Sequence, residues 1–191
     1  KVGLFYVLLG AESSSDADLK YLGKNINLNE TRKAVRLLKK HDVIAQTNFI
    51  LGLPDETKES IQRTREFAKC LDPDVAVFTP ITPFPGTEIY DELGGLGLID
   101  ETDLSKFDYL TPVARTHKLS RRQLQKEIIK SYIQFYARPS KTVKSICSRK
   151  PFARKVLFHM LRVMATYQFK QYIYDDLPDT CSKQKLADKK Q

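Results

Sequence analysis

The first half of the chain alternates between apolar runs and stretches with helical periodicity. The apolar runs at 2–9, 43–51 and 75–81 have the length and composition of strands buried on both faces. A helix is expected between each pair of successive strands, with one apolar face buried. The face of the first helix comprises Ala34, Val35, Leu37 and Leu38, and that of the second comprises Ile61, Phe67, Ala68 and Leu71. Strands and helices that alternate at this spacing predict parallel strands joined by crossover helices.

Local signals predict where several helices begin and end. Asn27 with Glu30, and Ser120 with Gln123, have the spacing of a capping box. The second pair begins a helix that is expected to end at Arg138-Pro139. Its apolar stripe comprises Leu124, Ile128, Ile129, Tyr132, Ile133 and Tyr136.

Shorter helices and a tail complete the expected elements. A short helix over 16–22 is expected to end at Gly23, and the Pro/Gly loop within 82–93 to lead into another. A further helix is expected from about Pro151 to Tyr172, followed by a disordered tail over 178–191.

Charge divides the chain near Thr116. Residues 1–114 hold 13 Lys/Arg and 18 Asp/Glu, a net charge of −5, whereas residues 115–191 hold 19 and 5, a net charge of +14. A solvated basic face on a helical extension is the interpretation we favour. An amphipathic membrane-surface helix, a cap over an anionic substrate and a nucleic-acid surface are the functional alternatives, and no nucleic-acid-binding motif is present.

Cysteine usage and hydropathy indicate a cytoplasmic protein. Cys70, Cys147 and Cys181 are far apart, so they predict neither a disulfide framework nor a metal site. Cys70 is expected in the core, at helical spacing from Phe67. No apolar run approaches the length of a membrane span, and the first residues make a poor signal peptide.

Three predicted strands end in similar sequences, LLGAESSS, FILGLPDET and TPITPFPGT. Ligands bind beyond the carboxyl ends of parallel strands, so these ends predict a site. Gly52 would let a ligand approach the backbone, and Phe49 and Ile50 would offer an apolar wall to a flat ring. A turn into a helix whose first residues are acidic also explains any one of these ends alone.

The same segments resemble a known family. GAES, FILGLPDET and TPFPGTEIY are similar to the second half of a radical S-adenosylmethionine (SAM) core domain, closest to the cobalamin-binding class that includes the anaerobic magnesium-protoporphyrin monomethyl ester cyclases. YLTPVARTHKLS and SYIQFYARPS are similar to the C-terminal extension of that class. The resemblance implies an α/β fold, the second half of a partial (β/α)6 TIM-like barrel followed by an α-helical extension.

The resemblance also implies a division of the chain. Residues 1–95 would form the C-terminal half of the core domain, 96–116 a linker, 117–177 the basic helical extension and 178–191 the tail. Half a barrel leaves an open sheet edge and an uncovered apolar face, so poor stability in isolation is expected.

The resemblance assigns cofactor contacts to the first strand end. Glu12 and Ser13 stand where the family contacts the ribose and amino-acid parts of SAM. Lys24 matches a basic position that would face the SAM carboxylate, although a solvated lysine is an equal alternative.

Further contacts are implied at the second and third ends. The family motif G-x-I-x-G-x-x-E is matched by Ile50 and Gly52, which would pack against adenine, while Asn48 replaces its first glycine. Asp55 stands at the acid position with Glu56 next to it, so either acid is a candidate. Phe78, with Thr79, lies near where backbone groups of the family meet adenine, and a plain strand residue is the alternative.

The implied activity is reductive cleavage of SAM to start radical chemistry, an oxidative cyclisation or methylation, on a tetrapyrrole- or lipid-like substrate. The family holds its [4Fe-4S] cluster in a Cys-x-x-x-Cys-x-x-Cys loop, which this sequence lacks, so its ligands are expected upstream and this piece alone is expected to be inactive. Cobalamin is a candidate further cofactor, and ferredoxin or flavodoxin a candidate electron donor. The alternative is a non-catalytic half barrel whose basic helices bind a membrane or nucleic acid.

Overall fold

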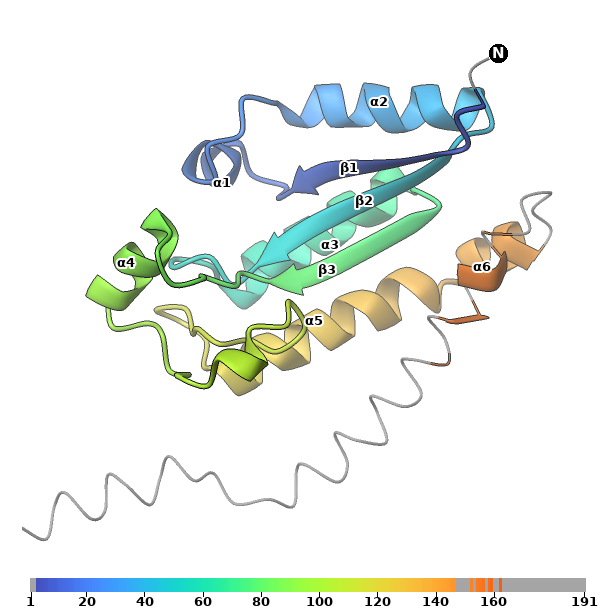
Figure 1. Cartoon of the computed structure of the whole chain (residues 1–191). Helices are drawn as coiled ribbons and strands as arrows, with labels where there is room; N and C mark the ends of the chain where they lie inside the picture. The colour runs from blue at the N-terminus through green and yellow to red at the C-terminus, as the bar shows by residue number, and fades with distance from the viewer. Residues whose placement is uncertain (1–2, 147–151, 153, 157, 160–161, 163–191) are drawn as a thin grey trace, which may run out of the picture.

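The structure is a computed structural model of the whole chain. It describes residues 3–146 together with 152, 154–156, 158–159 and 162 (Figure 1). The tail from 178 and most of the helix expected from 151 lie outside the described residues.

A parallel sheet with crossover helices forms the first half of the chain. Its strands are β1 (Tyr6–Glu12), β2 (Ile44–Leu51) and β3 (Val75–Pro80), hydrogen-bonded in the order β1-β2-β3. The connecting helices are α1 (Asp16–Tyr21), α2 (Leu28–Lys40) and α3 (Lys58–Leu71). The predicted α/β class with parallel strands is therefore confirmed, whereas the partial barrel and the domain boundaries stay predictions.

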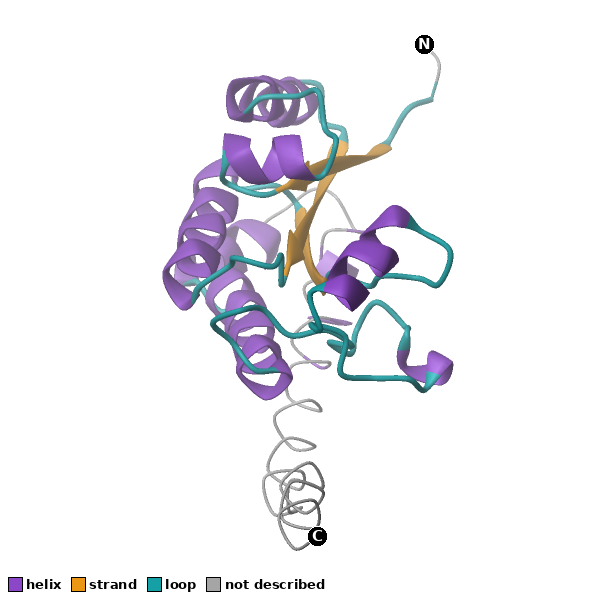
Figure 2. Ribbon diagram, turned by 90° about the vertical axis from the view of Figure 1, so that its left-hand side faces the viewer, coloured by secondary structure: helices purple, strands orange, loops and turns teal. Residues whose placement is uncertain are grey.

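The remaining elements follow β3. They are α4 (Glu88–Gly95), a 3-10 helix η1 (Leu104–Lys106), α5 (Arg121–Tyr136) and α6 (Pro139–Ile146). Helices α2, α3 and α5 cover one face of the sheet, while α4 and the loops around η1 lie on the other side (Figure 2). We call the first the helix face and the second the open face.

Side chains alternate between these two faces along each strand. Phe49 and Phe78 point to the helix face, where their rings stack 5.3 Å apart and the Phe135 ring of α5 meets Phe78 edge-on at 6.3 Å. The stripes predicted for α3 and α5 contribute to this core. The helix face therefore holds the main apolar core.

Both predicted capping boxes are present. The Asn27 side chain accepts the Glu30 N–H at 3.0 Å and the Glu30 carboxylate accepts the Asn27 N–H at 2.9 Å. Ser120 and Gln123 make the same exchange at the start of α5. These contacts span only three residues, which is why sequence spacing predicts them well.

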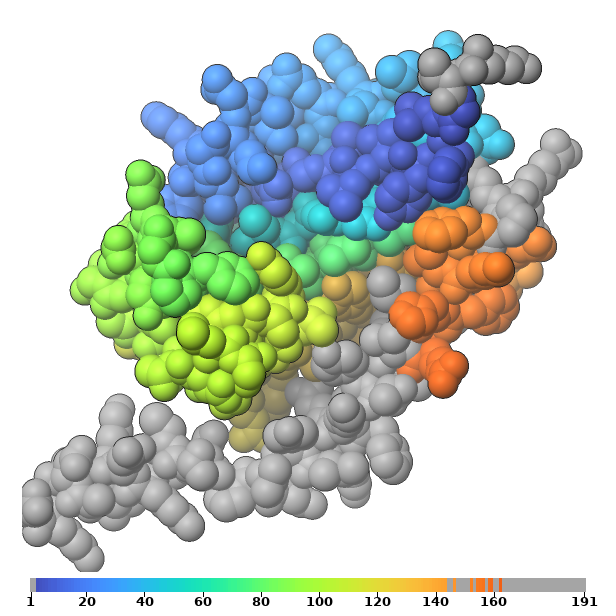
Figure 3. Space-filling model, in the orientation of Figure 1, coloured from blue at the N-terminus to red at the C-terminus, as the bar shows by residue number. Residues whose placement is uncertain are grey.

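Several burial predictions were wrong. Leu37 is 58% exposed on α2 and Cys70 is exposed on α3, because each points away from the buried side of its helix. The first strand begins at Tyr6, later than expected, and Leu8 is 55% exposed because nothing described covers the open face there. Figure 3 shows the dark-blue residues of this segment at the surface.

A buried ion pair joins α3 to α5. The Arg65 guanidinium donates to the Glu127 carboxylate at 2.6 Å and to the Ser131 hydroxyl at 3.2 Å, and Arg65 is only 1% exposed. Breaking such a pair on one side leaves an uncompensated buried charge. The pair therefore fixes how α5 lies against α3.

Two tyrosines of α5 pair with the outer edge of β3. The Tyr136 hydroxyl accepts the Ala76 N–H at 3.1 Å and donates to the Ala76 carbonyl at 2.9 Å, and the Tyr132 hydroxyl accepts the Phe78 N–H at 3.0 Å. The next residue on this edge is Pro80, which has no N–H. Side chains thus satisfy an edge that would otherwise need another strand.

Cationic side chains gather at the C-terminus of α3. Lys39 donates to the Asp72 carbonyl at 2.6 Å, Arg138 to the Lys69 carbonyl at 3.1 Å, and Lys141 to the Pro73 carbonyl. Cations are favourable at this end of a helix dipole. Lys141 belongs to α6, a helix that the sequence reading missed because Pro139 was taken as the end of the preceding helix.

Tyr136→Phe is expected to lower the free energy of unfolding by about 2 kcal/mol, because a buried N–H and a buried carbonyl lose their partner. Tyr132→Phe is expected to cost less, since it loses one hydrogen bond at a half-buried site. Urea unfolding measures both, with exposed Tyr109→Phe as the matched control. Equal stabilities of all three variants would contradict the role given to these hydroxyls.

Candidate functional site

The carboxyl ends of the three strands lie at one edge of the sheet, close to α1 and α4 (Figure 1). The β1–β2 register shifts between Gly10 and Glu12, and Glu12 adopts a left-handed φ of 56°. This irregularity turns the chain out of the strand and into the turn before α1.

Glu12 and Lys24 are brought together at the end of β1. The Lys24 ammonium lies 3.2 Å from the Glu12 carboxylate, which is mostly buried, while the lysine side chain is partly exposed. The Glu12 carboxylate folds back over Gly10, where a Cβ atom would clash with it. The glycine is therefore needed for the position of the acid.

Ser13 has an internal role in this structure. Its hydroxyl donates to the Asp18 carboxylate at 2.6 Å and accepts the Ser15 N–H at 3.1 Å. Both contacts order the turn into α1, and the residue is 1% exposed. The Ser13 hydroxyl, which was predicted to contact SAM, is therefore engaged in hydrogen bonds within the protein.

The structure separates the two acids of FILGLPDET. Glu56 is buried, and its carboxylate accepts the N–H groups of Gly52 and Leu53, the latter at 3.3 Å. The Asp55 side chain is 97% exposed and lies 3.9 Å from the His117 imidazole. Glu56 thus holds the turn after β2, and Asp55 points to solvent.

Burial raises the pKa of Glu56 to about 7. The nearby Asp18 carboxylate acts in the same direction, while the N–H groups of Gly52 and Leu53 oppose the rise. The carboxyl therefore changes protonation near neutral pH.

Gly52 contacts protein rather than open space. Its φ of 95° favours glycine, and an added Cβ would lie 2.6 Å from a Leu124 methyl of α5. Close packing of α5 thus accounts for the glycine, and the approach of a ligand to this backbone stays a prediction.

The predicted apolar wall is divided between the two faces. Phe49 and Phe78 lie in the core of the helix face, and the Phe78 N–H is taken by Tyr132, so neither ring is available to a ligand. Alternation places Ile50 and Thr79 on the open face, where Ile50 packs against a second apolar cluster that includes Leu93 of α4. Ile50 thus stays the predicted apolar contact for a flat ring of the ligand.

A polar row on the open face was missed by the sequence reading. The Tyr6 hydroxyl donates to the Gln46 amide oxygen, and the Gln46 amide nitrogen donates to the Asn48 amide oxygen at 2.8 Å. The available signal was the period-two placement of Gln46 and Asn48 in an otherwise apolar strand.

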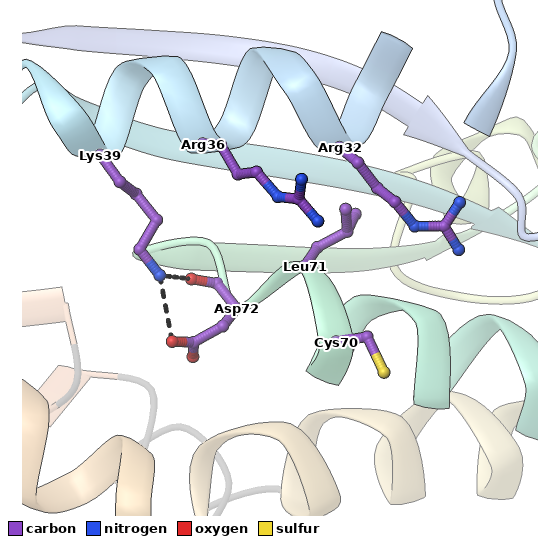
Figure 4. Close-up of a pocket in the computed structure, with 6 residues that line it drawn as sticks. All are labelled: Arg32, Arg36, Lys39, Cys70, Leu71 and Asp72. Atoms are coloured by element: carbon purple, nitrogen blue, oxygen red, sulfur yellow. Dashed lines mark hydrogen bonds and ion pairs between the residues drawn. The ribbon is translucent and has the colours of Figure 1, made fainter. Parts of the chain in front are cut away.

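A separate groove lies on the helix side of the sheet, between α2 and the C-terminal end of α3 (Figure 4). It has a volume of about 580 Å³ and is lined by Arg32, Arg36, Lys39, Cys70, Leu71 and Asp72. Lys39 is held by Asp72, and Arg32 lies over the Phe67 ring at 4.9 Å. None of the predicted cofactor contacts reaches this groove.

The described part of the chain has neither a metal-binding cluster nor a membrane-spanning helix. That part holds no group of three or more His, Cys, Asp or Glu side chains placed to bind a metal ion. None of its helices has the length and apolarity needed to cross a bilayer.

Comparison with known proteins identifies the relatives of the chain. No family model matches it. It is 35% identical over 162 residues to an uncharacterized methyltransferase of Pyrococcus horikoshii, covering 84% of this chain and 35% of that protein. It is 27% identical over 175 residues to the anaerobic magnesium-protoporphyrin IX monomethyl ester cyclase of Rubrivivax gelatinosus, covering 92% of this chain and 31% of that protein.

The chain is a homologue of these cyclases and of bacteriochlorophyllide methyltransferases. The resemblance to the class that includes these cyclases is therefore confirmed. The chain spans about a third of the length of these relatives. Among solved structures, the radical SAM methyltransferase TsrM of Kitasatospora setae, with cobalamin and a [4Fe-4S] cluster bound, matches 64% of this chain and 26% of its own, at 18% identity and a TM-score of 0.46.

Stability of this homologue is expected to fall between pH 5 and pH 8. The folded state holds the Glu56 proton more tightly than the unfolded state does, so this stabilisation is complete below about pH 4.5 and is lost as pH rises through about 7. The loss is on the order of 3 kcal/mol.

Glu56→Gln stays neutral and keeps an acceptor for the Gly52 N–H, so it is expected to remove this pH dependence. Urea unfolding at several pH values tests it, with Glu66→Gln, an exposed acid of α3, as control. Identical pH profiles for the native chain and Glu56→Gln would show that Glu56 does not titrate in this range.

Proposed function

We propose that this chain is the C-terminal part of a radical SAM enzyme, in which it binds SAM and shapes the substrate site. The observation that carries the proposal is the Glu12–Lys24 pair at the carboxyl end of β1, on a chain homologous to the cyclases and methyltransferases. Ligand sites of parallel α/β sheets lie at this edge.

The residues at this edge fit SAM chemically. SAM carries an α-amino group and a carboxylate, which match the Glu12 carboxylate and the Lys24 ammonium respectively. Each side chain would exchange its present partner for one group of the ligand. Ile50, on the open face beside Thr79, offers an apolar contact to adenine.

The [4Fe-4S] cluster does not fit the described residues. Its thiolate ligands need three cysteines close together, and the described part of the chain has Cys70 alone, exposed on α3. We therefore assign the residues described here to binding and orientation, with no part in electron transfer. The proposal places the cluster ligands upstream of Lys1.

The wider reaction follows from the class. We propose radical chemistry on a tetrapyrrole- or lipid-like substrate, with oxidative cyclisation or methylation as the outcome. The same proposal includes cobalamin as a further cofactor and a ferredoxin or flavodoxin as the electron donor. It also includes a cytoplasmic location with contact to a membrane surface. A non-catalytic half barrel that binds membrane or nucleic acid through its basic helices is the alternative.

Glu12→Gln and Lys24→Met are expected to weaken SAM binding by about tenfold each, because each loses one charge-assisted contact. The measurement is calorimetric titration with SAM, using the longest natural polypeptide that contains this chain, reconstituted anaerobically with iron and sulfide. Glu66→Gln, an exposed acid far from the strand ends, serves as the control.

Formation of 5′-deoxyadenosine by the same preparation separates the enzyme from the alternative. The native protein is expected to form it under reducing conditions. Failure to bind SAM and to form 5′-deoxyadenosine would reject the enzyme proposal, and SAM affinity unaffected by Glu12→Gln would reject this site.

A further inference from the structure

The open face of the sheet carries a hydrogen-bonded polar row beside the proposed SAM site. Tyr6 belongs to β1, and Gln46 and Asn48 to β2, where side chains two residues apart share a face. The row runs from the start of β1 towards the carboxyl ends of the strands. We call Tyr6, Gln46 and Asn48 the polar row.

Hydrogen bonds give the row a direction. The Tyr6 hydroxyl has one proton, which it donates to the Gln46 oxygen, and Gln46 in turn donates to the Asn48 oxygen. The Asn48 amide nitrogen is therefore left as the donor at the carboxyl end of the row. Asn48 pairs in register with Gly10, over which the Glu12 carboxylate lies.

The neighbours of the row are apolar. The register places Leu8 and Val75 on either side of Gln46, and Gly10 and Val77 on either side of Asn48. The Phe152 ring meets Tyr6 edge-on at 5.6 Å, at the other end of the row. The surface thus combines flat apolar strips with a central line of hydrogen-bonding groups.

The row does not serve the core of the described chain. The main apolar cluster lies on the helix face. Thr47, between Gln46 and Asn48 in the sequence, points to that face, and its buried hydroxyl has no hydrogen-bond partner. Gln46 and Asn48, in contrast, are only half-buried and lie on the side that α2, α3 and α5 do not cover. Three polar side chains linked on such a face are suited to a ligand.

We propose that the polar row positions the substrate, with the Asn48 amide donating to a carbonyl or carboxylate oxygen on an otherwise apolar scaffold. The inference rests on the proposed function and names residues for the substrate rather than for SAM. An acceptor oxygen is expected because the Asn48 amide nitrogen, at the carboxyl end of the row, donates to no other member of the row. Leu8 and Val77 would contact the apolar part of the same ligand.

The test uses the longest natural polypeptide that contains this chain and magnesium-protoporphyrin IX monomethyl ester as the probe, a flat apolar ring that bears ester and carboxylate oxygens. Absorbance titration measures probe affinity and calorimetry measures SAM affinity. The variants are Asn48→Leu and Gln46→Leu. Thr47→Val, one residue from each but on the opposite face, is the matched control.

Asn48→Leu is expected to weaken probe binding by about five- to tenfold and Gln46→Leu by less, because the second acts by orienting Asn48. SAM affinity is expected to stay unchanged in both, and Thr47→Val to change neither affinity. Circular dichroism of each variant confirms that it is folded.

Three results would overturn the inference while leaving the proposed function intact. The native protein could bind SAM but not the probe, or Asn48→Leu could bind the probe as tightly as the native protein does. In the third, Asn48→Leu would lose SAM affinity in parallel with probe affinity. The last would assign the row to the cofactor. A native protein that binds neither ligand would overturn the inference together with the proposed function.

Discussion

The pairing of two tyrosine hydroxyls with the backbone of β3 is the interaction on which the rest of the structure depends. A three-stranded parallel sheet has two edges, and each exposes backbone groups that need partners. Tyr132 and Tyr136 satisfy the β3 edge, and Pro80 removes the next N–H. Because these side chains come from α5, the helix after the charge boundary packs as part of the sheet's core.

Helix α5 also sets the geometry of the candidate site. Its Leu124 occupies the space beside Gly52, and its position is fixed by the buried Arg65–Glu127 pair. The turn held by Glu56 is therefore packed from both sides, by its own carboxylate and by α5. The sheet then divides into a helix face that supplies stability and an open face that carries Ile50 and the polar row.

Sequence patterns predicted those features that depend on local spacing. The capping boxes, the parallel strands and the buried stripe of α3 follow from periodicity and contacts within one turn. Long-range contacts were not predictable in the same way: a helical stripe shows that Tyr132 and Tyr136 face inward, but not that their hydroxyls reach a strand edge 54 to 60 residues away. The burial predictions for Cys70 and Leu37 were wrong for a related reason. Periodicity indicates the direction of a helix's apolar face, but not how wide a part of the helix packs against its neighbours. At the candidate site, the resemblance implied that Glu12 and Lys24 each contact SAM, but their ion pair was not predicted. The division between Asp55 and Glu56 depended on which carboxylate turned inward.

Native-state hydrogen exchange at β3 tests the central claim most directly. If α5 replaces the missing neighbour of β3, the amides of Ala76 and Phe78 should be protected to about the same degree as the amides of β2 that lie between two strands. Exchange of Ala76 and Phe78 at the rate of an unstructured peptide, while β2 stays protected, would contradict the claim that α5 completes the sheet.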